Sequence, residues 1–184
     1  MAEVAAPNPT PRPNRNYLSV GRNLLKQLGQ CLLAAAIGYG GFYFGSRHLI
    51  QSVQVDGCSM SPTLADTHRY FLNRLVFHVR EPKPQEIVVL RDPSDNVALV
   101  KRVVAKPGDM VYLKDGKIFV NGKLLKESYL PPGTRTFGDP HYREQLCICG
   151  INRYYVLGDN RKNSLDSRIF GAVSRQGILG LLML

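Results

Sequence analysis

A stretch of twenty uncharged residues near the N-terminus constrains this chain more than any other feature. Residues 27–46, with the sequence QLGQCLLAAAIGYGGFYFGS, lie between Lys26 and Arg47. A helix of that length just spans a hydrocarbon core of about 30 Å. A buried core helix would carry polar residues at helical period, and a cleavable secretory signal would end in a small-x-small site. The stretch has few polar residues and no small-x-small site directly after it, so the sequence predicts a transmembrane anchor.

The basic residues around this stretch predict its orientation. Residues 1–50 carry five Lys and Arg side chains against the single acid Glu3, and four of these bases precede the stretch. The positive-inside bias therefore places the N-terminus in the cytosol and makes the lipid bilayer an expected partner. We expect residues 1–26 to be a flexible basic cytosolic tail, residues 27–46 the transmembrane anchor helix, and residues 47–184 an exported domain.

Short apolar runs broken by turn signals fill the chain from Val53 onward, a pattern typical of a mostly β architecture. Asp115-Gly116 and Asn121-Gly122 are signals for the primed turns of β-hairpins. Residues 128–150, with several Pro and Gly, are expected to form a long loop. We therefore expect a β-sheet or partial-barrel domain behind one N-terminal transmembrane helix. The expected strands cover residues 86–91, 97–104, 110–114, 117–121, 154–158 and 177–184.

Composition argues against two classes of partner. The formal net charge is +10, but acids and bases are mixed along the chain, and no zinc-finger, basic-zipper or RNA-binding aromatic signature is present. We expect no nucleic acid partner. Cys147 and Cys149 are separated by one residue, not by the two of a zinc knuckle, and the histidines are not spaced as ligands. We expect two packed thiols, no metal and no cofactor.

Three polar blocks carry the candidate chemistry. They are GCSMSPTL (57–64), VKRVVAKPGD (100–109) and GDNRKNSLDSR (158–168). None contains histidine, so a hydrolytic site here needs another base. Lys101 shares one face of its expected strand with apolar neighbours, and desolvation lowers the pKa of a lysine toward the range of a general base.

Ser59 lies in the first block on a turn between Gly57 and Pro62. A serine hydroxyl becomes a nucleophile when a base is adjacent and a backbone N–H holds the oxyanion. Each residue also has a simpler interpretation. Lys101 then extends from a sheet edge to water, and Ser59 is an ordinary turn residue.

The order and separation of the three blocks behind an apolar segment resemble the type I signal peptidases, a family of membrane-bound serine–lysine proteases. The resemblance covers about residues 53–180. It implies an endopeptidase in which Ser59 is the nucleophile and Lys101 the general base, acting through an acyl-enzyme without metal or cofactor. The implied substrates are secretory preproteins whose signal peptides end in small residues at positions −1 and −3.

The resemblance also assigns roles to residues around this pair. The backbone N–H of Ser59 would form the oxyanion hole, and Ser164 would orient the lysine amine. Gly57 stands where some family members carry a serine that assists the oxyanion. The expected structural residues near the site are Asp159, Asn160, Asp166 and Arg168, the last two as an ion pair. The expected lining of the substrate pocket is Met60, Leu64, Leu99 and Val100.

Location and competing functions follow from the same features. We expect a single-pass protein of the plasma (inner) membrane, with the catalytic domain on the outer or periplasmic side. An organellar inner-membrane or thylakoid processing peptidase of the same family is one alternative. Self-cleaving serine–lysine repressors would require a DNA-binding domain that residues 1–50 do not supply. The last alternative is a membrane-tethered β-rich binding module without catalysis.

Overall fold

Two units make up this chain. The computed structural model describes residues 15–138 and 144–184, and its contacts divide the chain into the units Met1–Ser46 and Arg47–Leu184. Helix α1 covers Arg15–Leu49, so it begins within the segment expected to be a flexible tail. Residues 1–14, which include the start of that expected tail, lie outside the described residues.

Helix α1 carries the uncharged stretch that the sequence singles out. Its described side chains from residue 23 to residue 43 are exposed, among them Leu25, Leu32 and Phe42. Judged by length and mean hydropathy together, no helix within the described residues qualifies as a membrane span. The anchor over residues 27–46 therefore stays a prediction.

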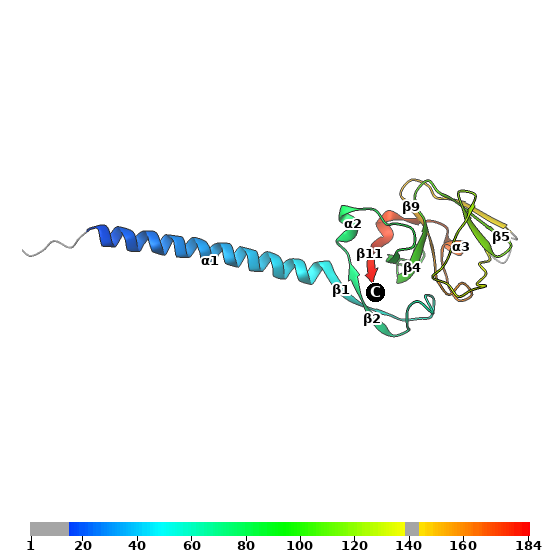
Figure 1. The fold of residues 1–184 in the computed structure, drawn as a ribbon, viewed down its shortest axis with the longest axis horizontal. Helices are drawn as coiled ribbons and strands as arrows, with labels where there is room; N and C mark the ends of the chain where they lie inside the picture. The colour runs from blue at the N-terminus through cyan, green and yellow to red at the C-terminus, as the bar shows by residue number, and fades with distance from the viewer. Residues whose placement is uncertain (1–14, 139–143) are drawn as a thin grey trace, which may run out of the picture. The chain divides into compact units, whose positions relative to one another are not determined.

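The second unit consists mainly of two antiparallel sheets (Figure 1). The larger sheet has seven strands in the order β1-β2-β11-β3-β4-β9-β10. The strands are β1 (Ile50–Val55), β2 (His68–Asn73), β3 (Ile87–Arg91), β4 (Ala98–Ala105), β9 (Arg153–Leu157), β10 (Val173–Ser174) and β11 (Ile178–Met183). The mostly β fold is confirmed, and the described strands form two sheets and no closed barrel.

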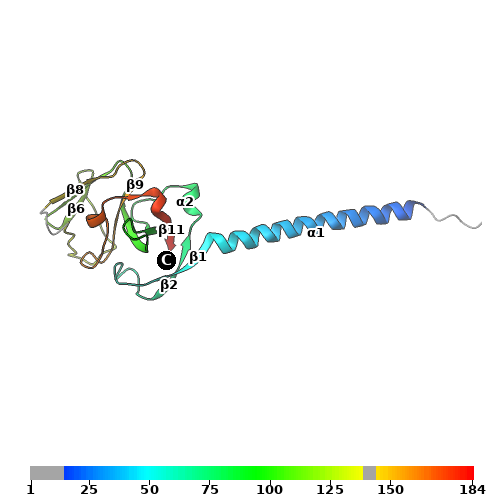
Figure 2. The ribbon, with the colours of Figure 1, turned by 180° about the vertical axis from the view of Figure 1, so that it is seen from behind.

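The smaller sheet has four strands in the order β7-β6-β5-β8 and lies at the end of the unit away from β1 and β2 (Figure 2). The strands are β5 (Met110–Lys114), β6 (Lys117–Val120), β7 (Lys123–Leu124) and β8 (Glu144–Ile148). Its two hairpins turn at Asp115-Gly116 and Asn121-Gly122. All four of these residues have positive φ, as a primed turn requires.

Short helices connect the strands of the larger sheet. They are α2 (Val76–Val79), α3 (Ser167–Phe170) and the 3₁₀ helix η1 (Arg175–Gly177). The side chain of Asp166 caps α3 by accepting a hydrogen bond from the backbone N–H of Arg168. This cap fixes the end of the third polar block against β9.

Strand β3 passes through the centre of the hydrophobic core. Ile87 and Val89 pack into one buried cluster, and Val88 and Leu90 pack into another on the opposite face. Burial on both faces explains why this strand reads as a continuous apolar run. Its neighbour β4 places Lys101 directly opposite Val88, so the lysine side chain enters the interior of the protein.

The expected strands agree with the observed ones to within one residue at each end. The expected loop over residues 128–150 is wrong at its C-terminal end, because β8 pairs with β5 there. Gln145 and Cys147 face inward while Leu146 and Ile148 are exposed. The usual alternation of buried apolar and exposed polar side chains is inverted, so the strand pattern is hidden in the sequence.

Candidate active site

The turn after β1 presents Ser59. Gly57 begins the turn with φ of 111°, a conformation that side chains beyond glycine rarely adopt, and its N–H donates to the carboxylate of Asp66 at 2.7 Å. The carbonyls of Cys58 and Ser59 accept hydrogen bonds from Asn160, at 3.0 Å from its Nδ2 and 2.9 Å from its backbone N. Asn160 therefore holds the turn at residues 57–64, called the serine turn below, against the third polar block.

Lys101 reaches Ser59 from β4. Its Nζ is hydrogen-bonded to the Oγ of Ser59 at 3.0 Å, and the lysine residue is only 2% exposed. Burial lowers the pKa of Lys101, while the charges of Asp166 and Asp92 oppose that shift and the charge of Arg168 adds to it. A neutral amine at this distance is able to take the proton of the hydroxyl.

Asp166 and Arg168 form a buried ion pair beside this contact. The Nε and Nη2 of Arg168 donate to the two carboxylate oxygens of Asp166, each at 2.8 Å. Asp166 also accepts from the backbone N–H of Gly158 at 3.0 Å. Arg168 in turn donates to the carbonyl of Arg161 at 2.7 Å, so the pair closes the third block into a rigid loop.

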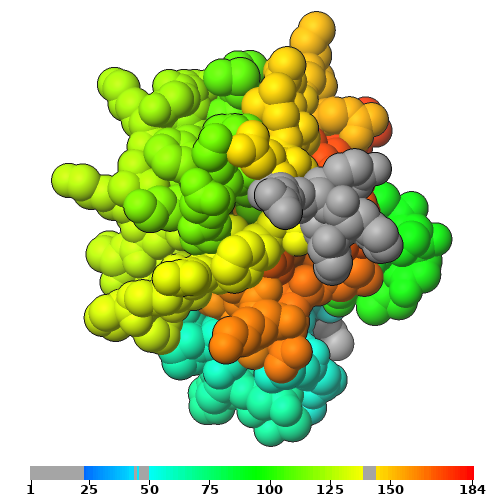
Figure 3. Space-filling model, turned by 90° about the vertical axis from the view of Figure 1, so that its right-hand side faces the viewer, coloured from blue at the N-terminus to red at the C-terminus, as the bar shows by residue number. Residues whose placement is uncertain are grey.

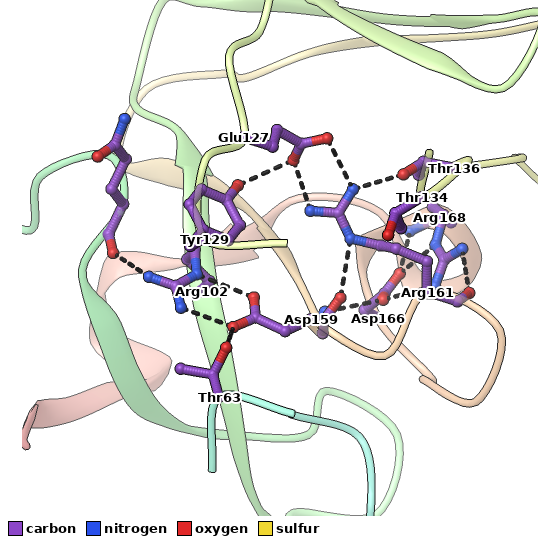
Figure 4. A network of polar contacts seen from close by, with 12 residues as sticks. Thr63, Arg102, Glu127, Tyr129, Thr134, Thr136, Asp159, Arg161, Asp166 and Arg168 are labelled. Carbon is purple, nitrogen blue, oxygen red and sulfur yellow. Dashed lines mark hydrogen bonds and ion pairs between the residues drawn. The ribbon is translucent and has the colours of Figure 1, made fainter. Parts of the chain in front are cut away.

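A second buried ion pair joins that loop to β4 (Figure 4). Asp159 accepts from the Nε and Nη2 of Arg102 at 2.9 and 2.6 Å, and from the hydroxyl of Thr63 at 2.5 Å. Arg102 is the neighbour of Lys101, and Thr63 belongs to the serine turn. Asp159 therefore connects the strand that carries the base to the turn that carries the hydroxyl.

A third ion pair ties the same loop to the segment between β7 and β8. The side chain of Arg161 is 1% exposed and pairs with Glu127, with 2.5 Å between Nη2 and Oε1. It also donates to the carbonyl of Gly158 at 2.9 Å and to the hydroxyl of Thr136 at 2.5 Å. Tyr129 completes the contact by donating to Glu127 at 2.8 Å, as Figure 4 shows.

Ser164 lies close to the serine turn but makes no hydrogen bond. Its buried Oγ has no partner among the described residues, so the expected hydrogen bond to the amine of Lys101 is not formed in this structure. A Cβ added to Gly158 would lie 2.1 Å from this Oγ and 2.6 Å from the carbonyl oxygen of Ser59. Only glycine at position 158 permits so close an approach.

The residues expected to line the substrate pocket lie mostly in the core. Met60 and Leu64 are 1% and 2% exposed and belong to the same buried cluster as Val89. Leu99 and Val100 are half-buried and pack against core clusters from the two faces of β4. The turn after β1 therefore directs its apolar side chains inward, away from an open pocket.

The described residues contain no group of three or more His, Cys, Asp or Glu side chains placed to hold a metal ion. Cys147 and Cys149 are free thiols. Burial raises the pKa of both, that of Cys149 to about 11, which keeps them protonated at neutral pH.

Comparison with known proteins places this chain in a family. A sequence model described as "Signal peptidase, peptidase S26" matches residues 24–184. The chain belongs to this family. It is similar to a probable signal peptidase I-2 of Synechocystis, with 34% identity over 175 residues that cover 91% of this chain and 72% of that protein. Signal peptidase I T of Bacillus subtilis is 35% identical over 146 residues, which cover 73% of this chain and 72% of that protein. A crystal structure of a signal peptidase I from Enterococcus faecalis is 25% identical, covers 56% of this chain and 98% of that chain, and aligns with a TM-score of 0.47.

Several residues of this signal peptidase family member escape sequence reasoning. Arg102 and Arg161 lie inside the polar blocks, but their partners are not evident from their type. Glu127, Tyr129 and Thr136 lie outside the blocks altogether, in the segment expected to be a loop or just before it. Glu127 is the one acid between Asp115 and Asp139, and this isolation is the one local signal that points to it.

Proposed function

We propose that this chain is a membrane-anchored endopeptidase that removes signal peptides from exported preproteins. Ser59 is the nucleophile and Lys101 the general base. The hydrogen bond of 3.0 Å between the buried Nζ and the Oγ carries the proposal. Membership of the signal peptidase family supplies the substrate class.

In the proposed reaction, the neutral amine of Lys101 takes the proton of Ser59 while the Oγ attacks the carbonyl carbon of the scissile peptide. The carbonyl electrons move onto oxygen, where the backbone N–H of Ser59 stabilises the oxyanion. When the intermediate collapses, the C–N bond breaks and the ammonium group of Lys101 protonates the leaving amine. A water molecule then gives a proton to the same amine, attacks the ester and regenerates the Ser59 hydroxyl.

The surroundings of Lys101 support its role as a base. Because desolvation penalises the ammonium form, burial lowers the pKa and raises the fraction of neutral amine near pH 7. The carboxylate of Asp166 would favour the ammonium form, but it is hydrogen-bonded to Arg168, whose positive charge acts in the opposite direction. No histidine is needed.

The N-terminal helix supports a membrane location for this reaction. Its exposed apolar side chains include Leu28, Leu33 and Ile37, and no charged residue lies between Lys26 and Arg47. An uncharged helical stretch with a basic N-terminal flank suits a single-pass anchor with a cytosolic N-terminus. We place the catalytic unit on the outer or periplasmic side of a plasma (inner) membrane, where preproteins emerge. An organellar or thylakoid membrane is the alternative location.

Cleavage of a preprotein by the full chain in detergent tests the proposal. Ser59→Ala and Lys101→Ala are each expected to lower kcat by roughly 10³-fold or more, because nucleophile and base act as a unit. The matched controls are Ser52→Ala and Lys83→Ala, which change exposed residues of the same types. Sequencing of the new N-terminus should place the cut after a small-x-small site. Equal product from all five proteins would refute the mechanism and favour the non-catalytic binding module.

A further inference from the structure

A groove of about 890 Å³ lies beside the serine turn and has no role in the proposed mechanism. Residues from three segments line it: 61–62 of the serine turn, 131–138 between β7 and β8, and 159–169 of the third polar block. Figure 3 shows the three segments next to one another on one face, in blue-green, yellow and orange. A polypeptide bound there would pass next to the turn that carries Ser59, because Ser61 and Pro62 are among the lining residues.

Several residues that line the groove lie next to the turn that carries Ser59. Ser61 follows Ser59 by two positions, and Ser164 lies against Gly158, whose added Cβ would also touch the Ser59 carbonyl. Asn160, another lining residue, donates two hydrogen bonds to the serine turn. The part of a substrate adjacent to the scissile bond is therefore the natural occupant of the groove.

Three charged side chains in the groove lining are buried and already paired within the protein. The one carboxylate in the lining, that of Asp159, is fully buried and paired with Arg102. The guanidinium groups of Arg161 and Arg168 are likewise buried and paired, with Glu127 and Asp166. These three side chains contribute little free charge to the surface of the groove.

Two other cations in the lining are available to a ligand. Arg135 and Lys162 are both exposed, and neither forms an ion pair with any described residue. Phe137 and Ile169 add exposed apolar surface, at 59% and 55% exposure. The groove thus offers positive charge together with apolar contact area, and it presents no exposed carboxylate from its described lining.

We infer that this groove binds the substrate polypeptide next to the scissile bond, and that Arg135 and Lys162 favour substrates with Asp or Glu in that stretch. The inference rests on the proposed function and adds a charge specificity to it. Because both cations are exposed, each contributes a modest, salt-sensitive attraction that acts on binding. The proton transfer between Lys101 and Ser59 does not involve them.

A charge-reversal experiment tests the inference. The substrates are preprotein peptides that carry a single Glu, Gln or Lys at each position near the cut except −1 and −3, which stay small, and they are assayed with the full chain in detergent. The wild type should cleave the Glu form with a KM about 1.5- to 5-fold below that of the Lys form at one or more positions. Arg135→Glu and Lys162→Glu should each remove most of this preference, the double variant should reverse it, and about 0.5 M NaCl should abolish it.

The controls separate specificity from damage to the fold. Lys117→Glu reverses an exposed charge on the smaller sheet, outside the groove lining, and should keep the wild-type preference. If a reversed variant does not fold, Arg135→Gln and Lys162→Gln should each weaken the preference without inverting it. Equal KM values for the Glu and Lys forms with the wild type would overturn the inference while leaving the peptidase activity intact. Failure of the proposed function looks different, because the wild type would then cleave no peptide of the series, the Gln forms included.

Discussion

The ion pair between Glu127 and Arg161 offers a sharp test of how the third polar block is held. Arg161 is 1% exposed and Glu127 is 16% exposed, so the pair is largely removed from solvent. Glu127→Gln keeps the size of the side chain but removes the negative charge, and it points an amide N–H toward a guanidinium that has only donors. The buried charge of Arg161 then lacks its counter-ion.

Breaking a buried pair from one side costs about 3–5 kcal/mol. For a chain of this size, that loss lowers Tm by about 6–20 °C. The matched control is Glu144→Gln, because the pair of Glu144 with Lys114 is 46% exposed on both sides. An exposed pair contributes about 0.2–1 kcal/mol, so the control variant should unfold close to the wild type.

Thermal unfolding in detergent, followed by circular dichroism, measures both variants. A third variant checks the cause: Glu127→Leu combined with Arg161→Met removes both charges and should unfold at a higher temperature than Glu127→Gln alone. If Glu127→Gln lowers Tm no more than Glu144→Gln does, the carboxylate of Glu127 is not needed to stabilise the buried charge of Arg161. The segment between β7 and β8 would then be held by its other contacts.

Two further predictions concern the catalytic contact itself. Asp92→Asn removes a carboxylate that favours the ammonium form of Lys101, so the pKa of the lysine should fall further and the acidic limb of the kcat/KM profile should move to lower pH. Asp95→Asn, an exposed neighbour, is its control, and a shift to higher pH would contradict the reasoning. Gly158→Ala should lower kcat strongly and cost about 1–3 kcal/mol of stability, because the new Cβ would lie 2.6 Å from the Ser59 carbonyl. Unfolding curves and kcat values identical to those of the wild type would show that the two loops are not in contact.

Local chemistry explains which parts of the fold the sequence predicts. The hairpins over residues 110–124 depend on Asp115-Gly116 and Asn121-Gly122, which adopt positive φ wherever they occur in such turns. Strand β8 escapes prediction because Leu146 and Ile148 are exposed. Its place is set by pairing with β5, a contact between residues distant in sequence.

The contacts of the candidate site are likewise predictable from the sequence only in part. Periodicity alone suggests that Lys101 has apolar neighbours, and the structure shows the side chain buried. The contact with Ser59 joins residues 42 positions apart, so no local pattern reveals it. The resemblance to signal peptidases supplies that pairing. It does not supply Glu127, whose partner Arg161 lies 34 positions further along the chain.

The buried charges around Lys101 have opposing effects on its pKa. An unpaired Asp166 would hold a proton on Lys101, because an opposite charge nearby favours the ammonium form. Arg168 binds both oxygens of Asp166 and has the opposite effect on the pKa of Lys101, so the pair partly cancels its own field at the amine. Desolvation then becomes the largest influence on the lysine. The ion pair that rigidifies the third block therefore also limits the rise that Asp166 alone would cause in the pKa of Lys101, and a variant that breaks the pair changes both the loop and the pKa.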